Sequence, residues 1–293
     1  IKVDLENTNI INKLDKIFIK VTENKLIGED RYQTAIKVSN RGWSKSENVV
    51  IVNSSAIVDA LSATPFAKMK DAPILLTAKD KLNKETKKEI TRLGAKNVYI
   101  IGGSGVISEN IVSELKAMNL NVDRISGDTR YTTSLAIAKR LGKVSEIAVV
   151  NGVTGLADAV SIAPVAAERN IPIILSSPNE GTKVFDEYIK SNNIKTSYII
   201  GGEAAISKDI ASKLPNLNRL GGLSRNETNA IILEKFYTNK NLNNIFVAKD
   251  GMKKVDDLID ALSVGVLAAK ENSPLVIVGN KLDLKQEKLI ASK

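Results

Sequence analysis

One short signature occurs three times in this chain of 293 residues, each time just before a helical pattern. The copies begin at Gly28, Gly127 and Gly222, so that successive glycines lie 99 and 95 residues apart. Self-similarity at a fixed interval is the mark of a repeated architecture, and this interval is far longer than the unit of a solenoid. The length suits two or three ordinary domains. The repeat therefore predicts three tandem small domains.

Each copy of the signature places an arginine on the first turn of the predicted helix. The residue before the arginine is Asp30, Thr129 or Ser224, all favoured N-cap residues. A helix start carries partial positive charge, so a cation there is unfavourable. Guanidinium and free helix N–H groups could together grip a phosphate or carboxylate. An ion pair between units would also recur three times and remains an alternative. The arginines are Arg31, Arg130 and Arg225.

Strand and helix patterns alternate in the same order within each copy. A buried-strand pattern at 49–52, 147–150 and 245–248 follows the first helix, and an Asp-Ala-(Leu/Val)-Ser helix comes next. A proline then opens a second apolar strand, where its missing N–H costs no ladder bond. This alternation predicts an α/β fold with parallel sheets, whose ligands sit at the carboxyl ends of the strands. In the first two copies, an amphipathic helix connects this second strand to a third one.

Other recurring residues have a structural and a functional interpretation. The aspartates that open the second helix, Asp59, Asp158 and Asp260, are expected to cap it or to pair with the arginines. They are poor candidates for catalytic acids, because no second carboxylate or base recurs beside them. A basic residue also stands three positions before each signature glycine, where it is either solvated or flanks the same anion site. These residues are Lys25, Arg124 and Arg219.

Composition narrows the classes of function. The formal net charge is +9, which fits either a soluble Lys-rich surface or an acidic partner. The chain has no cysteine and no histidine, which excludes disulfides, Ser-His-Asp catalysis and the commonest zinc ligands. No apolar run reaches the length of a membrane span. We expect no metal, no cofactor and no membrane insertion.

With these motifs aligned in triplicate, the chain resembles the type 2 cell wall binding repeat of clostridial surface-layer and cell wall proteins. The resemblance covers residues from about Lys25 to Lys293. It implies three tandem Rossmann/Toprim-like modules arranged around a pseudo-threefold axis. It also implies a secreted, non-catalytic anchor at the Gram-positive cell wall or S-layer. The implied partner is an anionic secondary wall polysaccharide, with neighbouring surface-layer proteins as a further candidate.

The resemblance adds residues to the expected binding set. The family ties its Pro-Ile-Leu-Leu motif to polymer binding, whereas the pattern alone indicates a core strand. Tyr32 and Tyr131, which follow the first two arginines, join the set, while the third copy has Asn226 at that position. The motif residues are Pro73, Ile74, Leu75 and Leu76; Pro172, Ile173, Ile174 and Leu175; and Pro274, Leu275, Val276 and Ile277.

The expected domains are repeats over 21–122, 123–217 and 218–293, the last short at its C-terminal side. Residues 1–20 are expected to pack on the modules, against the first or completing the third. Two other functions compete with anchoring. An enzyme acting on a nucleotide sugar or phosphate would suit a Rossmann-like fold, but the glycine turn at 102–105 misses the dinucleotide fingerprint. Nucleic-acid binding would suit the charge, but only 4% of residues are aromatic and no known motif appears.

Overall fold

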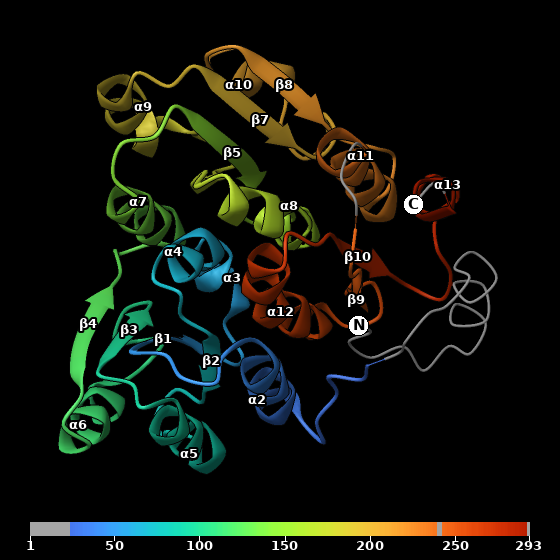
Figure 1. Ribbon diagram of the computed structural model, residues 1–293. Helices are drawn as coiled ribbons and strands as arrows, with labels where there is room; N and C mark the ends of the chain where they lie inside the picture. Colours follow the sequence, from blue (N-terminus) through green and yellow to red (C-terminus); the bar gives the residue numbers. More distant parts are fainter. Residues whose placement is uncertain (1–23, 239–241, 292–293) are drawn as a thin grey trace.

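The computed structural model describes residues 24–238 and 242–291, and the expected role of residues 1–20 lies outside this part. The chain forms three α/β modules, each built on its own parallel sheet (Figure 1). The sheet of module 1 has the order β2-β1-β3-β4, and that of module 2 has the order β6-β5-β7-β8. Their strands are β1 (Asn48–Asn53), β2 (Ile74–Thr77), β3 (Asn97–Ile101), β4 (Asn121–Ile125), β5 (Glu146–Asn151), β6 (Ile173–Ser176), β7 (Thr196–Ile200) and β8 (Leu217–Leu220).

Module 3 has a smaller sheet in the part of the chain that the structure describes. Its strands β9 (Phe246–Lys249) and β10 (Leu275–Val278) pair in parallel, as β1 pairs β2 and β5 pairs β6. The proline before the second strand of each pair accepts a hydrogen bond through its carbonyl, as in Val50 N–H to Pro73 O at 3.0 Å. The predicted parallel α/β fold in three modules is confirmed.

Two strands belong to a different unit from the one that the repeat suggests. In sequence, β4 and β8 open the second and third repeats, at the predicted boundaries before residues 123 and 218. In the structure β4 pairs with β3, and β8 pairs with β7, so each completes the preceding sheet. The signature glycine after each strand therefore marks the passage from one module to the next.

Helices cover both faces of the sheets and connect the strands (Figure 1). The helices that follow the signature are α2 (Arg31–Gly42), α7 (Arg130–Arg140) and α11 (Arg225–Tyr237). The peripheral helices are α5 (Lys84–Leu93), α6 (Glu109–Ala117), α9 (Asp186–Asn192), α10 (Lys208–Ala211) and α13 (Leu284–Ala291), with a 3₁₀ turn η1 (Lys183–Phe185). The remaining helices are α3 (Ile57–Ala60), α4 (Ala63–Met69), α8 (Leu156–Glu168) and α12 (Leu258–Lys270), the last preceded by the 3₁₀ turn η2 (Val255–Asp257).

Three of these helices, one from each module, meet in the middle of the molecule. Helices α4, α8 and α12 contact one another, and residues 156–167 of α8 are all buried (Figure 1). Small residues permit the approach: a Cβ added to Gly265 of α12 would lie 3.2 Å from Thr64 Cγ2 in α4 and 3.7 Å from Ala163 Cβ in α8. The helices that carry the Asp-Ala-(Leu/Val)-Ser motif in modules 2 and 3, and the helix that follows it in module 1, thus pack into one shared core.

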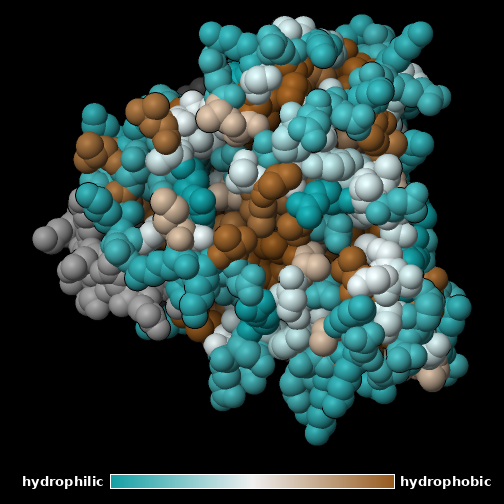
Figure 2. Space-filling model, turned by 180° about the vertical axis from the view of Figure 1, so that it is seen from behind, coloured by the Kyte–Doolittle hydropathy of each residue, from teal (hydrophilic) through white to brown (hydrophobic). Residues whose placement is uncertain are grey.

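The surface reflects this arrangement. Seen from behind, hydrophilic side chains cover the outer parts of the molecule, and apolar side chains gather in a hollow near the middle of the face (Figure 2). Apolar groups therefore reach the surface near the centre, where the three modules come together.

We expect Gly265 to be a sensitive position in this core. Gly265→Leu inserts a side chain between α4 and α8, and overpacking of this kind costs about 1–3 kcal/mol of unfolding free energy. Gly265→Ala serves as the matched control, because its tight contact with Thr64 is offset by a helix propensity gain of about 1 kcal/mol. Urea denaturation measures both, and equal stability of the Leu and Ala variants would contradict the close contact of the three helices.

Candidate functional site

The predicted helix starts are confirmed at all three copies of the signature. Asp30 Oδ1 accepts the N–H of Gln33 at 2.8 Å, and Ser224 Oγ accepts the N–H of Glu227 at 3.1 Å. Thr129 forms a full capping box with Thr132. Each cap leaves the following arginine as the first residue of its helix.

The signature glycine is required by the close approach of the helix. The N–H of Gly127 donates to Thr133 Oγ1 at 3.0 Å, and the other two copies repeat this bond at the same distance. A Cβ on Gly127 would lie 2.4 Å from Thr132 Oγ1, closer than packed atoms approach. The threonine six residues after the glycine is thus part of the motif, a role that the sequence analysis missed.

The three arginines make the same contact in all modules. Each guanidinium donates to a backbone carbonyl just beyond the strand that follows its helix. Arg130 Nη1 donates to Gly152 O at 2.8 Å, and Arg225 Nη1 donates to Asp250 O at 2.7 Å. Arg31 Nη1 donates to Ser54 O in the same way. The carbonyl holds the guanidinium at the carboxyl-end edge of the sheet, beside the helix N-terminus.

Each arginine also faces a carboxylate of another module. Burial raises the pKa of Asp59 in module 1, and the charge of Arg130 in module 2 opposes this rise. Arg225 in module 3 opposes the rise of the Asp158 pKa in module 2 in the same way. The third seam joins Arg31 of module 1 to Asp256 of module 3, whose atoms lie 3.5 Å apart. The arginines therefore lie at the seams between modules, which favours the ion-pair interpretation without removing the other.

Burial opposes ionisation of these aspartates more strongly than the arginines favour it. Burial raises the pKa of Asp59, and the nearby Arg130 charge only partly offsets this. Asp158 is 9% exposed, and burial raises its pKa to about 6 against the opposing charge of Arg225. The seam between modules 2 and 3 thus contains a carboxylate that gains a proton in mildly acidic solution.

The repeated aspartates are not N-caps, contrary to one of the two expected roles. The N-cap positions of α3, α8 and α12 are Ala56, Gly155 and Asp257. The repeated aspartates stand three residues further on, within the first turn, where a carboxylate suits the helix dipole. The residues concerned are Asp59, Asp158 and Asp260.

The basic residues three positions before the signature glycines make different contacts from the arginines at the seams. Arg124 Nη1 donates to Gly102 O at 2.9 Å, and its Nη2 pairs with Glu109 at 2.8 Å. Arg219 repeats the first bond to Gly201 O at 3.0 Å. These side chains hold the glycine turns that follow β3 and β7. Lys25, at the equivalent position of the first copy, is exposed.

The Pro-Ile-Leu-Leu strands lie in the core, as the pattern alone predicts. Every residue of the three motifs is buried, and none of the apolar side chains after the prolines exceeds 2% exposure. In this structure a polymer cannot touch these side chains, so any part they take in binding is to form the edge that carries the exposed groups. The residues are Pro73, Ile74, Leu75, Leu76, Pro172, Ile173, Ile174, Leu175, Pro274, Leu275, Val276 and Ile277.

The residue after each arginine covers the end of the same strand. Tyr32 Oη lies 2.8 Å from Ser54 Oγ, and the ring of Tyr131 lies so close to Gly152 that a Cβ there would be 2.6 Å from Cε1. In module 3 the shorter Asn226 donates to Ile277 O at 3.0 Å instead. Both tyrosines are half-buried beside the arginines and belong to the same surface.

Other classes of site find no support in the residues that the structure describes. Within 24–238 and 242–291, no group of three or more His, Cys, Asp or Glu side chains could hold a metal ion. None of the helices in this part of the chain is both long and apolar enough to cross a membrane. What recurs at each seam is a guanidinium at a helix N-terminus, a strand-end carbonyl and a neighbouring carboxylate.

Comparison with known proteins accounts for the triplicate arrangement. The model of the family described as cell wall binding domain 2 (CWB2) matches residues 25–112, 124–211 and 219–292. This chain belongs to the CWB2 family. Its three modules are therefore cell wall binding domains, of the kind found in tandem in surface proteins of Gram-positive bacteria.

Two curated proteins and two solved structures are similar to most of this chain. It is 34% identical to the N-acetylmuramoyl-L-alanine amidase LytC and to the amidase enhancer, both of Bacillus subtilis, over 91% and 89% of its length. It spans 52% and 35% of those proteins. The structure of Cwp8 from Clostridium difficile is 34% identical with a TM-score of 0.85, over 97% of this chain and 50% of that one. Cwp6 from the same organism is 37% identical with a TM-score of 0.81, over 88% and 43%.

The raised pKa of Asp158 predicts a pH dependence of stability. Its pKa is about 6 in the folded chain and 3.8 ordinarily, so the folded state holds a proton that the unfolded state has lost between these values. The free energy of unfolding therefore falls, through this group, as pH rises from about 4 to about 6. Asp158→Asn removes the effect and should gain up to about 2–3 kcal/mol on the wild type between pH 4 and pH 7.

Urea denaturation of both proteins at the two pH values measures this gain. Asp209→Asn, which changes an exposed carboxyl of module 2, is the control and should follow the wild type. A difference between Asp158→Asn and wild type that stays constant with pH would refute the assignment.

Proposed function

We propose that the chain is a non-catalytic anchor, which holds a secreted surface protein on the wall by binding an anionic secondary wall polysaccharide. The observation that carries the proposal is the threefold recurrence of a guanidinium fixed beside a helix N-terminus at a sheet edge. The helix N–H groups and the guanidinium together suit a phosphate or carboxylate. The net charge of +9 adds long-range attraction for a polyanion.

The seam aspartates are compatible with this role. A guanidinium has five N–H donors, of which the strand-end carbonyl takes one in each module. The carboxylate across the seam and a polymer anion can use different edges of the same planar group. Because the side chain is held by backbone, little conformational entropy is lost when the anion binds.

Three modest sites on one rigid body would act together. A polymer that presents anions at intervals can engage more than one seam, and each further contact then forms within the complex. The modules would be arranged about an approximate threefold axis, a proposal supported by the mutual contact of α4, α8 and α12. Catalysis, where a full-length protein has it, would lie outside this chain, and neighbouring surface-layer proteins are a further candidate partner of the anchor.

A binding assay with purified Gram-positive walls tests the proposal. Wild-type chain should be retained on intact walls and released by added salt, because exposed charge contacts are screened. Walls stripped chemically of their anionic polymer should retain much less of it. Equal retention on intact and stripped walls would rule out recognition of the anionic polymer.

Substitution of the seam arginines tests which groups bind. The triple variant Arg31→Ala, Arg130→Ala and Arg225→Ala should lose at least about tenfold in affinity for intact walls, the value of one charge-assisted hydrogen bond or more. The control removes three exposed lysines, one from each module: Lys87→Ala, Lys190→Ala and Lys235→Ala. It carries the same net charge and should bind more tightly than the arginine variant.

Circular dichroism and thermal melts establish that both variants are folded. If the folded arginine variant binds as well as the lysine control, the seam arginines join the modules and do not contact the polymer.

A further inference from the structure

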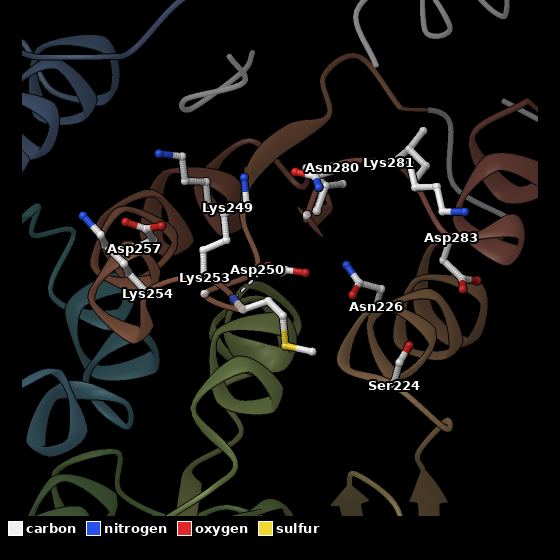
Figure 3. A pocket seen from close by; sticks show the side chains of 15 residues that line it. Ser224, Asn226, Lys249, Asp250, Lys253, Lys254, Asp257, Asn280, Lys281 and Asp283 are labelled. Carbon is white, nitrogen blue, oxygen red and sulfur yellow. Dashed lines mark hydrogen bonds between the residues drawn. The ribbon is translucent and has the colours of Figure 1, made fainter. Parts of the chain in front are cut away.

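Module 3 contains a cavity of about 720 Å³ at the carboxyl ends of β9 and β10 (Figure 3). Its size falls in the range of ligand pockets, roughly 300–1,000 Å³. The start of α11 provides one wall through Ser224 and Asn226, and the loop after β9 provides another through Asp250 and Met252. The cavity differs from the seam arginines in the groups that it offers.

The third copy of the signature differs from the other two beside this space. Asn226 stands where Tyr32 and Tyr131 stand in the other copies, and those rings cover the residue just beyond the neighbouring strand. The equivalent position of module 3 is Asp250, identified by its carbonyl, which accepts from Arg225. The shorter asparagine donates to Ile277 O instead. In modules 1 and 2 the loop after the third strand also reaches this sheet edge, through Val106 O and Ala205 O, whereas the described residues of module 3 include no third strand.

Asp250 is the chemically distinctive group in the cavity. The residue is only 6% exposed, and its Oδ1 accepts the N–H of Met252 at 2.9 Å. Across 24–238 and 242–291, no hydrogen bond to its other carboxylate oxygen, Oδ2, is found. The carboxylate points into the cavity, towards the side of Asn226 and Ser224 (Figure 3). Because Oδ2 is not sealed from solvent, it can accept a hydrogen bond from a molecule that enters the cavity.

The other groups that line the cavity indicate which hydrogen-bond donor Asp250 can bind. Ser224 and Asn226 supply a hydroxyl and an amide to the same space, and the exposed side chain of Met252 supplies an apolar surface. These groups suit a sugar ring, which carries hydroxyl donors at its edge and C–H groups on its faces. Exposed lysines Lys253, Lys254 and Lys281 are also among the lining residues, and they favour an anionic chain while disfavouring a free cation.

We propose that the cavity of module 3 binds a hydroxyl-rich sugar unit of the wall polysaccharide, with Asp250 accepting hydrogen bonds from its hydroxyl groups. The inference rests on the proposed function and deepens it. The seam arginines recognise the anionic substituents of the polymer, whereas this cavity recognises the sugar itself. The two contributions therefore respond differently when the anions are removed.

Two variants of module 3 test the cavity. Asp250→Asn keeps the shape and the contact with Met252 but removes the charge from the acceptor. Asn226→Tyr restores the residue of modules 1 and 2 and fills the space. Glu234→Gln is the matched control, because it removes the same charge from an exposed carboxyl of α11 that does not line the cavity.

Calorimetry measures binding to polysaccharide released from purified walls, and to the same material after its anionic groups have been removed. Asp250→Asn and Asn226→Tyr should each lose about tenfold in affinity for both polymers, the value of one hydrogen bond to a charged group. The Glu234→Gln control should stay within about twofold. The arginine triple variant should differ from wild type on the anionic polymer alone.

The outcomes separate the two proposals. Failure of the wild-type chain to bind anionic polymer would end the proposed function. Normal binding by folded Asp250→Asn and Asn226→Tyr would overturn the sugar site while leaving the anchor intact. Calcium binding that needs Asp250 and leaves polymer affinity unchanged would also overturn it, by assigning the carboxylate to a cation.

Discussion

The close packing of three apolar helices at the centre is the constraint on which the rest of this structure depends. Alanine, glycine and serine in α4, α8 and α12 let one helix of each module approach the other two. The helix faces are so fully buried that no module could expose them to water without losing much of its core. The modules are therefore held in fixed positions, and those positions bring an arginine of each module to a carboxylate of another.

The arginine on the first turn is a local conflict that the fold resolves. A cation at a helix N-terminus is unfavourable by itself. Here the guanidinium donates to a carbonyl at the end of a strand and faces an aspartate, so partial and full negative charge surround it. Sites where a local preference is overruled in this way, three times in one chain, are where function is expected. The same geometry that removes the conflict also holds the donor groups ready for an anion.

Much of the fold follows from local patterns, and the parts that do not are the long-range ones. The helix starts could be predicted because Asp30, Thr129 and Ser224 act within three residues of themselves. The pairing of β4 and β8 with the preceding sheets could not, because the repeat records where a motif starts and not which sheet its first strand joins. The seams depend on contacts between residues far apart in sequence, such as Arg31 and Asp256, which lie 3.5 Å apart.

The divergence of the third copy has a physical consequence that identical copies could not supply. Three similar arginine sites respond to the charge of a polymer and to the spacing of its anions. Exposed charge contacts, however, discriminate poorly between one polyanion and another. Discrimination needs buried polar groups that are satisfied by the correct partner and left unpaired by the wrong one. Asp250 is 6% exposed and lines the cavity of module 3, where Asn226 stands in place of the tyrosine of the other modules. An anchor that adds such a pocket to three arginine sites can therefore combine the avidity of a repeat with the selectivity of a single pocket.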